Sequence, residues 1–360
     1  MKQSNGSDGR PPATHGDKAF LRGFGASLVI ASAITAAFNV VINPLGYYPT
    51  HVLPPLVWAT RDTKVELMKA SGPAEAIVLG SSRSMKIAPR DIAREAHVGS
   101  AFNATVDGAR VEDDAAMLAF AAEDLKWPLR EVVLGLDIEA FHNHVGVDTR
   151  NAGCSELRAQ LPIAIRAEVF EEAAYAAVSA AMTRESLHAL SLFRSGTSEP
   201  PMRFDADGFL RVGTFDLSMK PITPAQYALA TSFDAFTGLD ERRKDMLESI
   251  AATADRHGMR VHAFITPLHS GYREYLEQTR GFAELRRATV ALLESIAQRH
   301  PSVTWRDFTD ARSFGGDDSL FYDVQHVNAD AAALIVRALF SGVSGARRDP
   351  PDPPPGLARD

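Results

Sequence analysis

The feature that most constrains the fold is a series of short apolar runs that lack the alternation of a half-exposed strand. They lie at residues 76–80, 100–106 and 131–138, and two further strands are expected at residues 259–267 and 303–308. Helical patterns at residues 87–96, 111–125, 232–257, 276–299 and 328–340 separate or follow them. Apolar strands that alternate with helices are typical of a parallel sheet covered on both faces. We therefore predict an α/β fold with a doubly wound, mostly parallel sheet of five strands.

The alternation of strand and helix lapses between about residues 150 and 225. Here the sequence predicts one or two alanine-rich helices within residues 157–193 and a hairpin within residues 203–215 that turns at Asp207-Gly208. We interpret this segment as an insertion at the edge of the sheet, in a domain of residues 75–342. Ligands of doubly wound sheets bind at the carboxyl ends of strands, so we expect the site in the loops that follow them.

An uncharged segment precedes this domain. No Lys, Arg, Asp or Glu occurs between Arg22 and Arg61. Residues 24–42 are apolar and long enough to cross a bilayer core, which takes a helix of about 20 residues. Basic residues come before the segment and aromatic residues after it, an order that places the basic end in the cytoplasm. We predict an anchor at residues 23–43 in the inner membrane of a bacterium, with the domain on the periplasmic or extracellular side.

A cleavable signal peptide and a buried core helix are the alternatives for this segment. Ala31-Ser32-Ala33 has the small residues of a cleavage site, but it lies in the middle of the apolar run, which favours an uncleaved anchor. Residues 1–22 and 343–360 are predicted to be disordered tails, the second rich in proline, and residues 44–74 to be a linker.

Composition and histidine spacing exclude several classes of function. The net charge of −7 gives no overall attraction to nucleic acid, so we predict no nucleic-acid partner. Cys154 is the only cysteine, which excludes an intrachain disulfide and multi-cysteine zinc or redox motifs. His142 and His144 have no clear carboxylate partner and are more typical of polar surface than of a metal site. We predict neither a metal nor an organic cofactor.

Two loops carry residues suited to nucleophilic catalysis. Ser82 follows the first strand, where N–H groups of the next helix can hold an oxyanion beside a reactive serine. Asp323 and His326 lie before the last helix and can supply a base and the carboxylate that orients it. As an alternative, the serine turn is only a helix cap, and the last loop is a surface loop in which Asn328 caps the final helix.

Together these loops resemble those of the SGNH (GDSL-like) hydrolases. The blocks that carry the resemblance, in the family's order, are Gly80-Ser81-Ser82 (GDS), Gly108 (the oxyanion glycine), Gly135-Leu136-Asp137 (GxND) and Asp323-Val324-Gln325-His326 (DxxH). The resemblance covers about residues 75–340 apart from the insertion. It implies a flavodoxin-like SGNH fold in which Ser82 is the nucleophile, His326 the base and Asp323 its orienting partner.

The resemblance also implies an oxyanion hole formed by the backbone N–H groups of Ser82 and Gly108. Asp137 stands where the family has a third donor, an asparagine. An ionised carboxylate accepts hydrogen bonds and repels an oxyanion, so Asp137 must be protonated, turned away or used otherwise. Ser81 is the nearest competitor for the nucleophile. Arg83 and His269 are candidates for substrate binding, with pairing to an acidic neighbour as the alternative for Arg83.

The N-terminal span, the GSSR form of the first block and the long insertion resemble the membrane-anchored branch of the superfamily, which includes SGNH-like proteins of alginate and teichoic acid modification. This implies a serine esterase or O-acyltransferase that uses a Ser82 acyl-enzyme. Its implied partners are an envelope polysaccharide or other acylated glycan and a multi-span membrane acyltransferase. The alternatives are a catalytically silent SGNH-like domain that binds glycan or scaffolds a membrane complex, favoured by Asp137, and a structural anchor protein.

Overall fold

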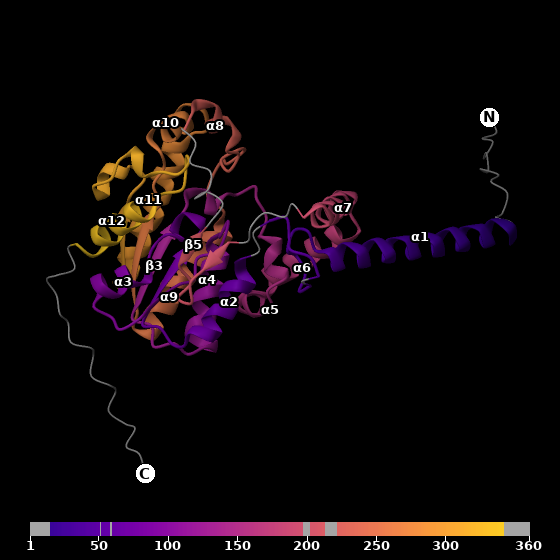
Figure 1. Cartoon of the computed structure of the whole chain (residues 1–360), viewed down its shortest axis with the longest axis horizontal. Helices are drawn as coiled ribbons and strands as arrows, with labels where there is room; N and C mark the ends of the chain where they lie inside the picture. The colour runs from indigo at the N-terminus through magenta and orange to yellow at the C-terminus, as the bar shows by residue number, and fades with distance from the viewer. Residues whose placement is uncertain (1–14, 51, 58–59, 197–201, 213–221, 342–360) are drawn as a thin grey trace, which may run out of the picture.

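The computed structural model describes residues 15–50, 52–57, 60–196, 202–212 and 222–341. The predicted tail at residues 343–360 lies outside the described residues. The prediction of a disordered tail at residues 1–22 is wrong for residues 15–22, because helix α1 (His15–Ile42) begins at His15. Residues 1–14 lie outside the described residues. Figure 1 shows α1 projecting from a folded body that is built around a sheet.

The main sheet has five strands, all parallel, as the sequence predicts. They are β1 (Ala76–Gly80), β2 (Ala101–Asn103), β3 (Glu131–Leu136), β6 (Arg260–Ile265) and β7 (Val303–Asp307). Their order is β2-β1-β3-β6-β7, and Gly80 at the end of β1 pairs with Gly135 of β3. The chain moves to one edge through β2 and then crosses β1 to reach β3, so the order reverses between β1 and β3. Doubly wound sheets bind ligands beside such a reversal.

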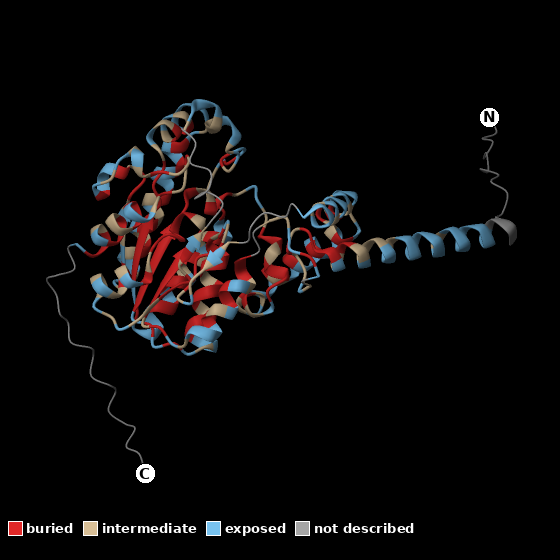
Figure 2. Cartoon of the chain, in the orientation of Figure 1, coloured by how far each residue is buried: buried red, intermediate tan, exposed pale blue. Residues whose placement is uncertain are grey.

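Helices cover both faces of the sheet because alternate strand residues point to opposite sides. On one face, Val78 and Val133 pack with α3 (Pro89–Ala96) and α12 (Ala329–Phe340). On the other face, strand residues such as Ile77 and Val132 pack with a larger set of helices. These are α4 (Val111–Ala119), α9 (Glu241–His257) and α11 (Phe282–Arg299). The buried strands between the two helical layers stand out in Figure 2.

Three helical segments differ from the prediction. The helix expected at residues 232–257 begins at Glu241, since Asp240 accepts a hydrogen bond from the Arg242 N–H and caps it; α8 (Pro224–Leu229) precedes it. The helix expected at residues 276–299 is two helices, α10 (Ser270–Thr279) and α11, because Gly281 takes a φ of +63° between them. The expected linker at residues 44–74 contains α2 (Thr60–Ser71), which buries Val65 and Met68 in the core.

The insertion contains three helices where one or two alanine-rich helices were predicted: α5 (Ser155–Gln160), α6 (Ile163–Val178) and α7 (Ala180–Ser195). Pro162 and the Ser179 cap separate them. The insertion also contains the expected hairpin, of β4 (Arg203–Phe204) and β5 (Leu210–Val212), in which Gly208 turns with a φ of +78°. Residues 213–215 of the predicted hairpin lie outside the described residues.

Helix α1 is long and apolar enough over Lys18–Ile42 to cross a membrane. Only 11% of its most apolar 18-residue stretch is buried inside the protein, whereas a core helix of a soluble domain is mostly buried. The helix ends at Asn43, which has a φ of +50° and whose side chain donates to the backbone oxygens of Tyr48 and Thr50. These bonds fix the turn through which α1 enters the body.

Candidate active site

The structure brings Ser82, His326 and Asp323 together at the carboxyl end of the sheet. Ser82 begins a short 3₁₀ turn directly after β1, and the other two residues lie on the loop before α12. The Ser82 Oγ atom is 2.9 Å from His326 Nε2, although 244 positions separate the two residues. His326 Nδ1 is 2.8 Å from Asp323 Oδ2. A hydroxyl, an imidazole and a carboxylate thus form a continuous hydrogen-bonded series.

The loop between Asp323 and α12 is shaped by its own hydrogen bonds. The Asp323 Oδ1 atom accepts the backbone N–H groups of Gln325 and His326, both at 2.8 Å. Burial raises the pKa of this carboxyl, but the His326 ring and these N–H groups outweigh burial and lower the pKa to about 2. Asn328 accepts the Ala331 N–H and caps α12, as predicted. The capping role and the serine–histidine–aspartate arrangement therefore coexist on one loop.

The turn that carries Ser82 is close-packed. The Ser81 side chain is buried and accepts the Arg83 N–H at 3.2 Å, so this competitor for the nucleophile serves as the cap of the turn. Gly80 has a φ of +129°, and a Cβ there would lie 2.6 Å from the Gly135 oxygen. A Cβ on Gly135 would lie 2.1 Å from the Ser84 Oγ atom. Two paired glycines are therefore needed beneath the turn.

The loop after β2 lies beside this turn. The Val106 N–H donates to the Gly80 oxygen at 3.1 Å, and Gly108 adopts a left-handed φ of +56° two residues later. A Cβ on Gly108 would lie 2.8 Å from Arg150 Nη2, so the position also requires glycine on steric grounds. In the described part of the chain, the hydrogen bonds of loops and turns include none donated by the N–H of Ser82 or Gly108. A role for these two N–H groups in an oxyanion hole stays a prediction.

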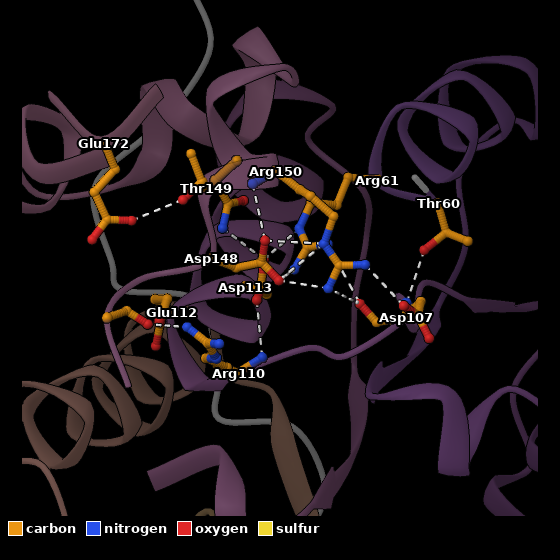
Figure 3. Close-up of polar contacts among 12 residues, drawn as sticks. Thr60, Arg61, Asp107, Arg110, Glu112, Asp113, Asp148, Thr149, Arg150 and Glu172 are labelled. Carbon is orange, nitrogen blue, oxygen red and sulfur yellow. Dashed lines mark hydrogen bonds and ion pairs between the residues drawn. The ribbon is translucent and has the colours of Figure 1, made fainter. Parts of the chain in front are cut away.

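A buried ionic network, shown in Figure 3, holds the Gly108 loop. Arg150 donates to the Asp107 carboxylate at 2.8 Å and to the Asp107 backbone oxygen at 3.1 Å. Arg150 also pairs with Asp148, which in turn pairs with Arg61 of α2 at 3.2 Å. Arg61 donates to Asp113 of α4 at 2.8 Å. Burial raises the pKa of Asp148, but the arginines and their hydrogen bonds outweigh it and lower the pKa.

Sequence reasoning missed this network. Arg61 lies in the segment interpreted as a linker, and Asp148 and Arg150 lie at the start of the insertion. No motif connects these segments. The one available signal was the mixture of charged and apolar residues in 60–71, which is better suited to a packed helix than to a linker.

Asp137 is held as a hydrogen-bond acceptor. Its Oδ1 atom accepts the Thr266 hydroxyl at 2.7 Å and lies 3.5 Å from Arg83 Nη1. Arg83 is buried and also forms an ion pair with Glu139. Burial raises the pKa of Glu139, whereas the guanidinium of Arg83 opposes that rise. The Asp137 Oδ1 atom therefore belongs to a buried ion cluster, and Arg83 is paired rather than open to a substrate anion. A role for Asp137 in an oxyanion hole stays a prediction.

His269 lies against the loop that carries the aspartate and histidine. Its backbone N–H donates to the Val324 oxygen at 3.1 Å, and its ring Nδ1 accepts the Gly271 N–H and caps α10. The ring also packs edge-on against Phe321 at 5.8 Å. His269 thus supports the shape of this loop, and substrate contact stays a prediction.

The remaining histidines and the cysteine have structural surroundings. The buried His142 ring lies 2.8 Å from the Asp234 oxygen, and its Nδ1 accepts the His144 N–H. His262 is buried in the sheet, 2.9 Å from Glu131. Burial raises the pKa of the Cys154 thiol to about 12, so the thiol is protonated at neutral pH. Among the residues that the structure describes, no group of three or more His, Cys, Asp or Glu side chains is placed to hold a metal ion.

A cavity of about 470 Å³ adjoins the ionic network. Polar side chains on its wall include Tyr47, Asp107, Arg110, Asp148, Arg150 and Glu172. Because Asp107 precedes Gly108, the cavity begins next to the loop predicted to bind the oxyanion.

Comparison with known proteins identifies no family for this chain. No protein-family model matches the chain, and no curated protein matches it.

Proposed function

We propose that this chain is a membrane-anchored serine esterase or O-acyltransferase of the SGNH kind, acting on acyl esters of an envelope polysaccharide or another glycan. The hydrogen-bonded series Ser82–His326–Asp323, with distances of 2.9 and 2.8 Å, carries the proposal. A nucleophile within hydrogen-bond reach of a base, with the base held by a third group, is the arrangement that nucleophilic catalysis requires.

The reaction proceeds in two halves. Ser82 Oγ attacks the ester carbonyl carbon while His326 Nε2 takes the hydroxyl proton, and the carbonyl oxygen becomes an oxyanion facing the N–H groups of Ser82 and Gly108. When the carbon–oxygen bond to the alcohol breaks, His326 returns its proton to the departing alcohol. A sugar hydroxyl or water then attacks the acyl-enzyme, His326 takes that proton, and Ser82 regains it as the new ester or acid leaves.

The order of the sheet and the place of the site support the SGNH assignment. Ser82 follows β1 and Gly108 follows β2, and β1 is the strand at which the order reverses. The exposed apolar helix α1 supports the anchor. With its basic end in the cytoplasm, the body would lie on the periplasmic or extracellular face of a bacterial inner membrane, within reach of envelope glycans and a multi-span acyltransferase partner.

A second candidate, a catalytically silent SGNH-like domain that binds glycan or scaffolds a membrane complex, is favoured by Asp137. This residue accepts hydrogen bonds from Thr266 and is paired with Arg83, so the oxyanion would have two donors. Removal of one oxyanion donor costs about 10²–10³ in kcat in a well-studied serine protease. A low rate of hydrolysis is therefore expected even in an active enzyme.

The test uses the full chain in detergent micelles with 4-nitrophenyl acetate and a fluorophosphonate probe. We expect labelling of Ser82, and hydrolysis reduced about 10³-fold or more in both Ser82→Ala and His326→Ala. Ser81→Ala is the matched control. It removes the hydroxyl that caps the turn but keeps Ser82, His326 and Asp323, so it should lower stability and keep most of the activity. A folded wild-type protein that neither hydrolyses the ester nor reacts with the probe would favour the silent domain.

A further inference from the structure

Helix α6 has an exposed face on which seven of eight residues are apolar or aromatic, with Glu171 between them. The residues on this face, all exposed, are Ile163, Ala164, Ala167, Phe170, Glu171, Ala174, Tyr175 and Val178. Ile163, Phe170 and Tyr175 are 70–76% exposed. The eight positions of this face recur at spacings of three and four residues, which places them on one side of the helix. A surface helix of a soluble domain normally presents charged and polar residues there, so this face is suited to another apolar phase.

The opposite side of α6 already packs against the protein. Val169 and Ala173 on that side are buried in the main core. Helix α6 therefore has two apolar sides, and the described residues cover only one of them.

Helix α7, which contacts α6, also exposes apolar residues. Leu187 and Phe193 are 57% and 53% exposed, and Arg184 and Arg194 are also exposed. Figure 2 shows α7 largely exposed beside the end of α1. Apolar residues together with arginine are typical of helices that lie in the interface of a bilayer.

Both helices are fixed to α1 by one buried side chain. The Asn39 amide donates to the Ala177 oxygen of α6 at 2.9 Å and to the Thr183 hydroxyl of α7 at 3.0 Å. The Asn39 oxygen accepts the Ser186 hydroxyl of α7 at 2.9 Å. Ile42 of α1 packs nearby with Ala189. The last turns of α1 and the α6–α7 pair are therefore one unit, as their positions in Figure 1 also show.

The length of α1 sets the height of this unit. Asn39 lies 17 positions after Arg22, the last charged residue before the apolar run, which corresponds to about 25 Å of helix. The hydrocarbon core of a bilayer is about 30 Å thick. With Arg22 at one boundary of the core, Asn39 lies within about one helical turn of the other boundary. Helices bonded to Asn39 then lie at the boundary between the acyl chains and the lipid headgroups.

We infer that the exposed apolar face of α6, with Leu187 and Phe193 of α7, contacts the bilayer that α1 spans. Apolar side chains enter the boundary between headgroups and acyl chains, and the α7 arginines face anionic headgroups. The surface is thus a second, monotopic membrane contact. The inference rests on the membrane anchor of the proposed function and is independent of its chemistry.

The test places one environment-sensitive fluorophore at a time on the full chain in lipid nanodiscs, with and without lipids that carry a quencher in the acyl chain. The native Cys154 is buried and protonated, so single cysteines can be added without removing it. Phe170→Cys reports on the α6 face. Leu28→Cys, exposed on α1, is the positive control, and Arg287→Cys, exposed on α11, is the negative control.

We expect the lipid quencher to reduce the fluorescence at positions 170 and 28 severalfold more than at position 287. Quenching at position 28 without quenching at position 170 would overturn the inference and leave the α6 face to a protein partner. Absence of quenching at both positions would overturn the anchor as well. The esterase assay of Ser82→Ala does not depend on a bilayer, so failure of the surface and failure of the catalytic proposal are distinguishable.

Discussion

At the scale of single residues, the orientation of His326 depends on Asp323. The carboxylate uses one oxygen for the imidazole and the other for two backbone N–H groups. Its low pKa, about 2, means that it is ionised across the neutral range. An ionised acceptor at Nδ1 selects the tautomer in which Nε2 can take the serine proton.

Replacement of this carboxylate by an amide tests that role. We expect Asp323→Asn to lower kcat for 4-nitrophenyl acetate about 10³-fold or more, because an amide can donate to Nδ1 and stabilise the wrong tautomer. The amide oxygen can still accept the two backbone N–H groups, so the melting temperature should change little. The measurement pairs steady-state kinetics with thermal unfolding, and Asp317→Asn on an exposed turn is the control. A variant with wild-type kcat would exclude the orienting role.

The sequence was informative about some of these residues and silent about others. Ser82, Asp323 and His326 could be predicted because each lies on a loop next to a strongly patterned element. Arg61, Asp148 and Arg150 could not, since buried ion pairs between distant segments leave no periodic signal. The role of the Asp137 side chain could not be predicted from the sequence either. Its partners, Thr266 and Arg83, approach it only in the folded chain.

At the scale of elements, strands were easier to predict than helices. Apolar runs identified β1, β3 and β6 because both faces of these strands are buried. The edge strand β7 exposes Thr304 and Arg306, so its apolar pattern is weaker. The break between α10 and α11 was missed, since one left-handed glycine, Gly281, interrupts a helical pattern that continues on both sides. Helix α2 was missed because it buries charged residues. Arg61 and Lys64 are hydrogen-bonded to partners in the folded protein, so the buried side of α2 does not form an apolar pattern in the sequence.

The contact between α9 and the end of α11 is expected to depend on pH. His300 lies 2.6 Å from Asp255 and 2.8 Å from Glu248, and hydrogen bonds to these carboxylates raise its pKa. Because the folded-state pKa is raised, the stabilisation is complete below the ordinary value of about 6.5 and is lost as pH rises through the folded value.

We expect the wild type to lose about 0.5–1 kcal/mol of unfolding free energy, relative to His300→Gln, between pH 6 and pH 9. Urea denaturation at both pH values measures this difference. His257→Gln, at an exposed position at the end of α9, is the matched control. Equal pH dependence in the wild type and His300→Gln would contradict the assignment.

At the scale of the whole molecule, Asn39 joins the anchor to the body. Asn39→Leu would leave the Ala177 oxygen and the Ser186 hydroxyl without their partner, at a cost of about 1–3 kcal/mol. We expect amide hydrogen exchange in residues 163–195 to become about 10-fold faster or more, while exchange in β3 and β6 stays unchanged. Val41→Leu, on the exposed side of the same helix, is the control. Unchanged exchange in α6 and α7 would show that the joint does not depend on this side chain.

The buried hydrogen bonds of Asn39 and the fixed turn at Asn43 join the body directly to α1, without a flexible linker. In a bilayer the body would rotate about the α1 axis and diffuse laterally as fast as a membrane helix, but its distance from the membrane surface would stay fixed. Encounters with the acylated polymer proposed as substrate would then take place in a thin layer and depend on the number of acyl groups per unit area of membrane. The rate of encounter would depend less on the concentration of free substrate in solution than on the distance between the polymer and the lipid surface.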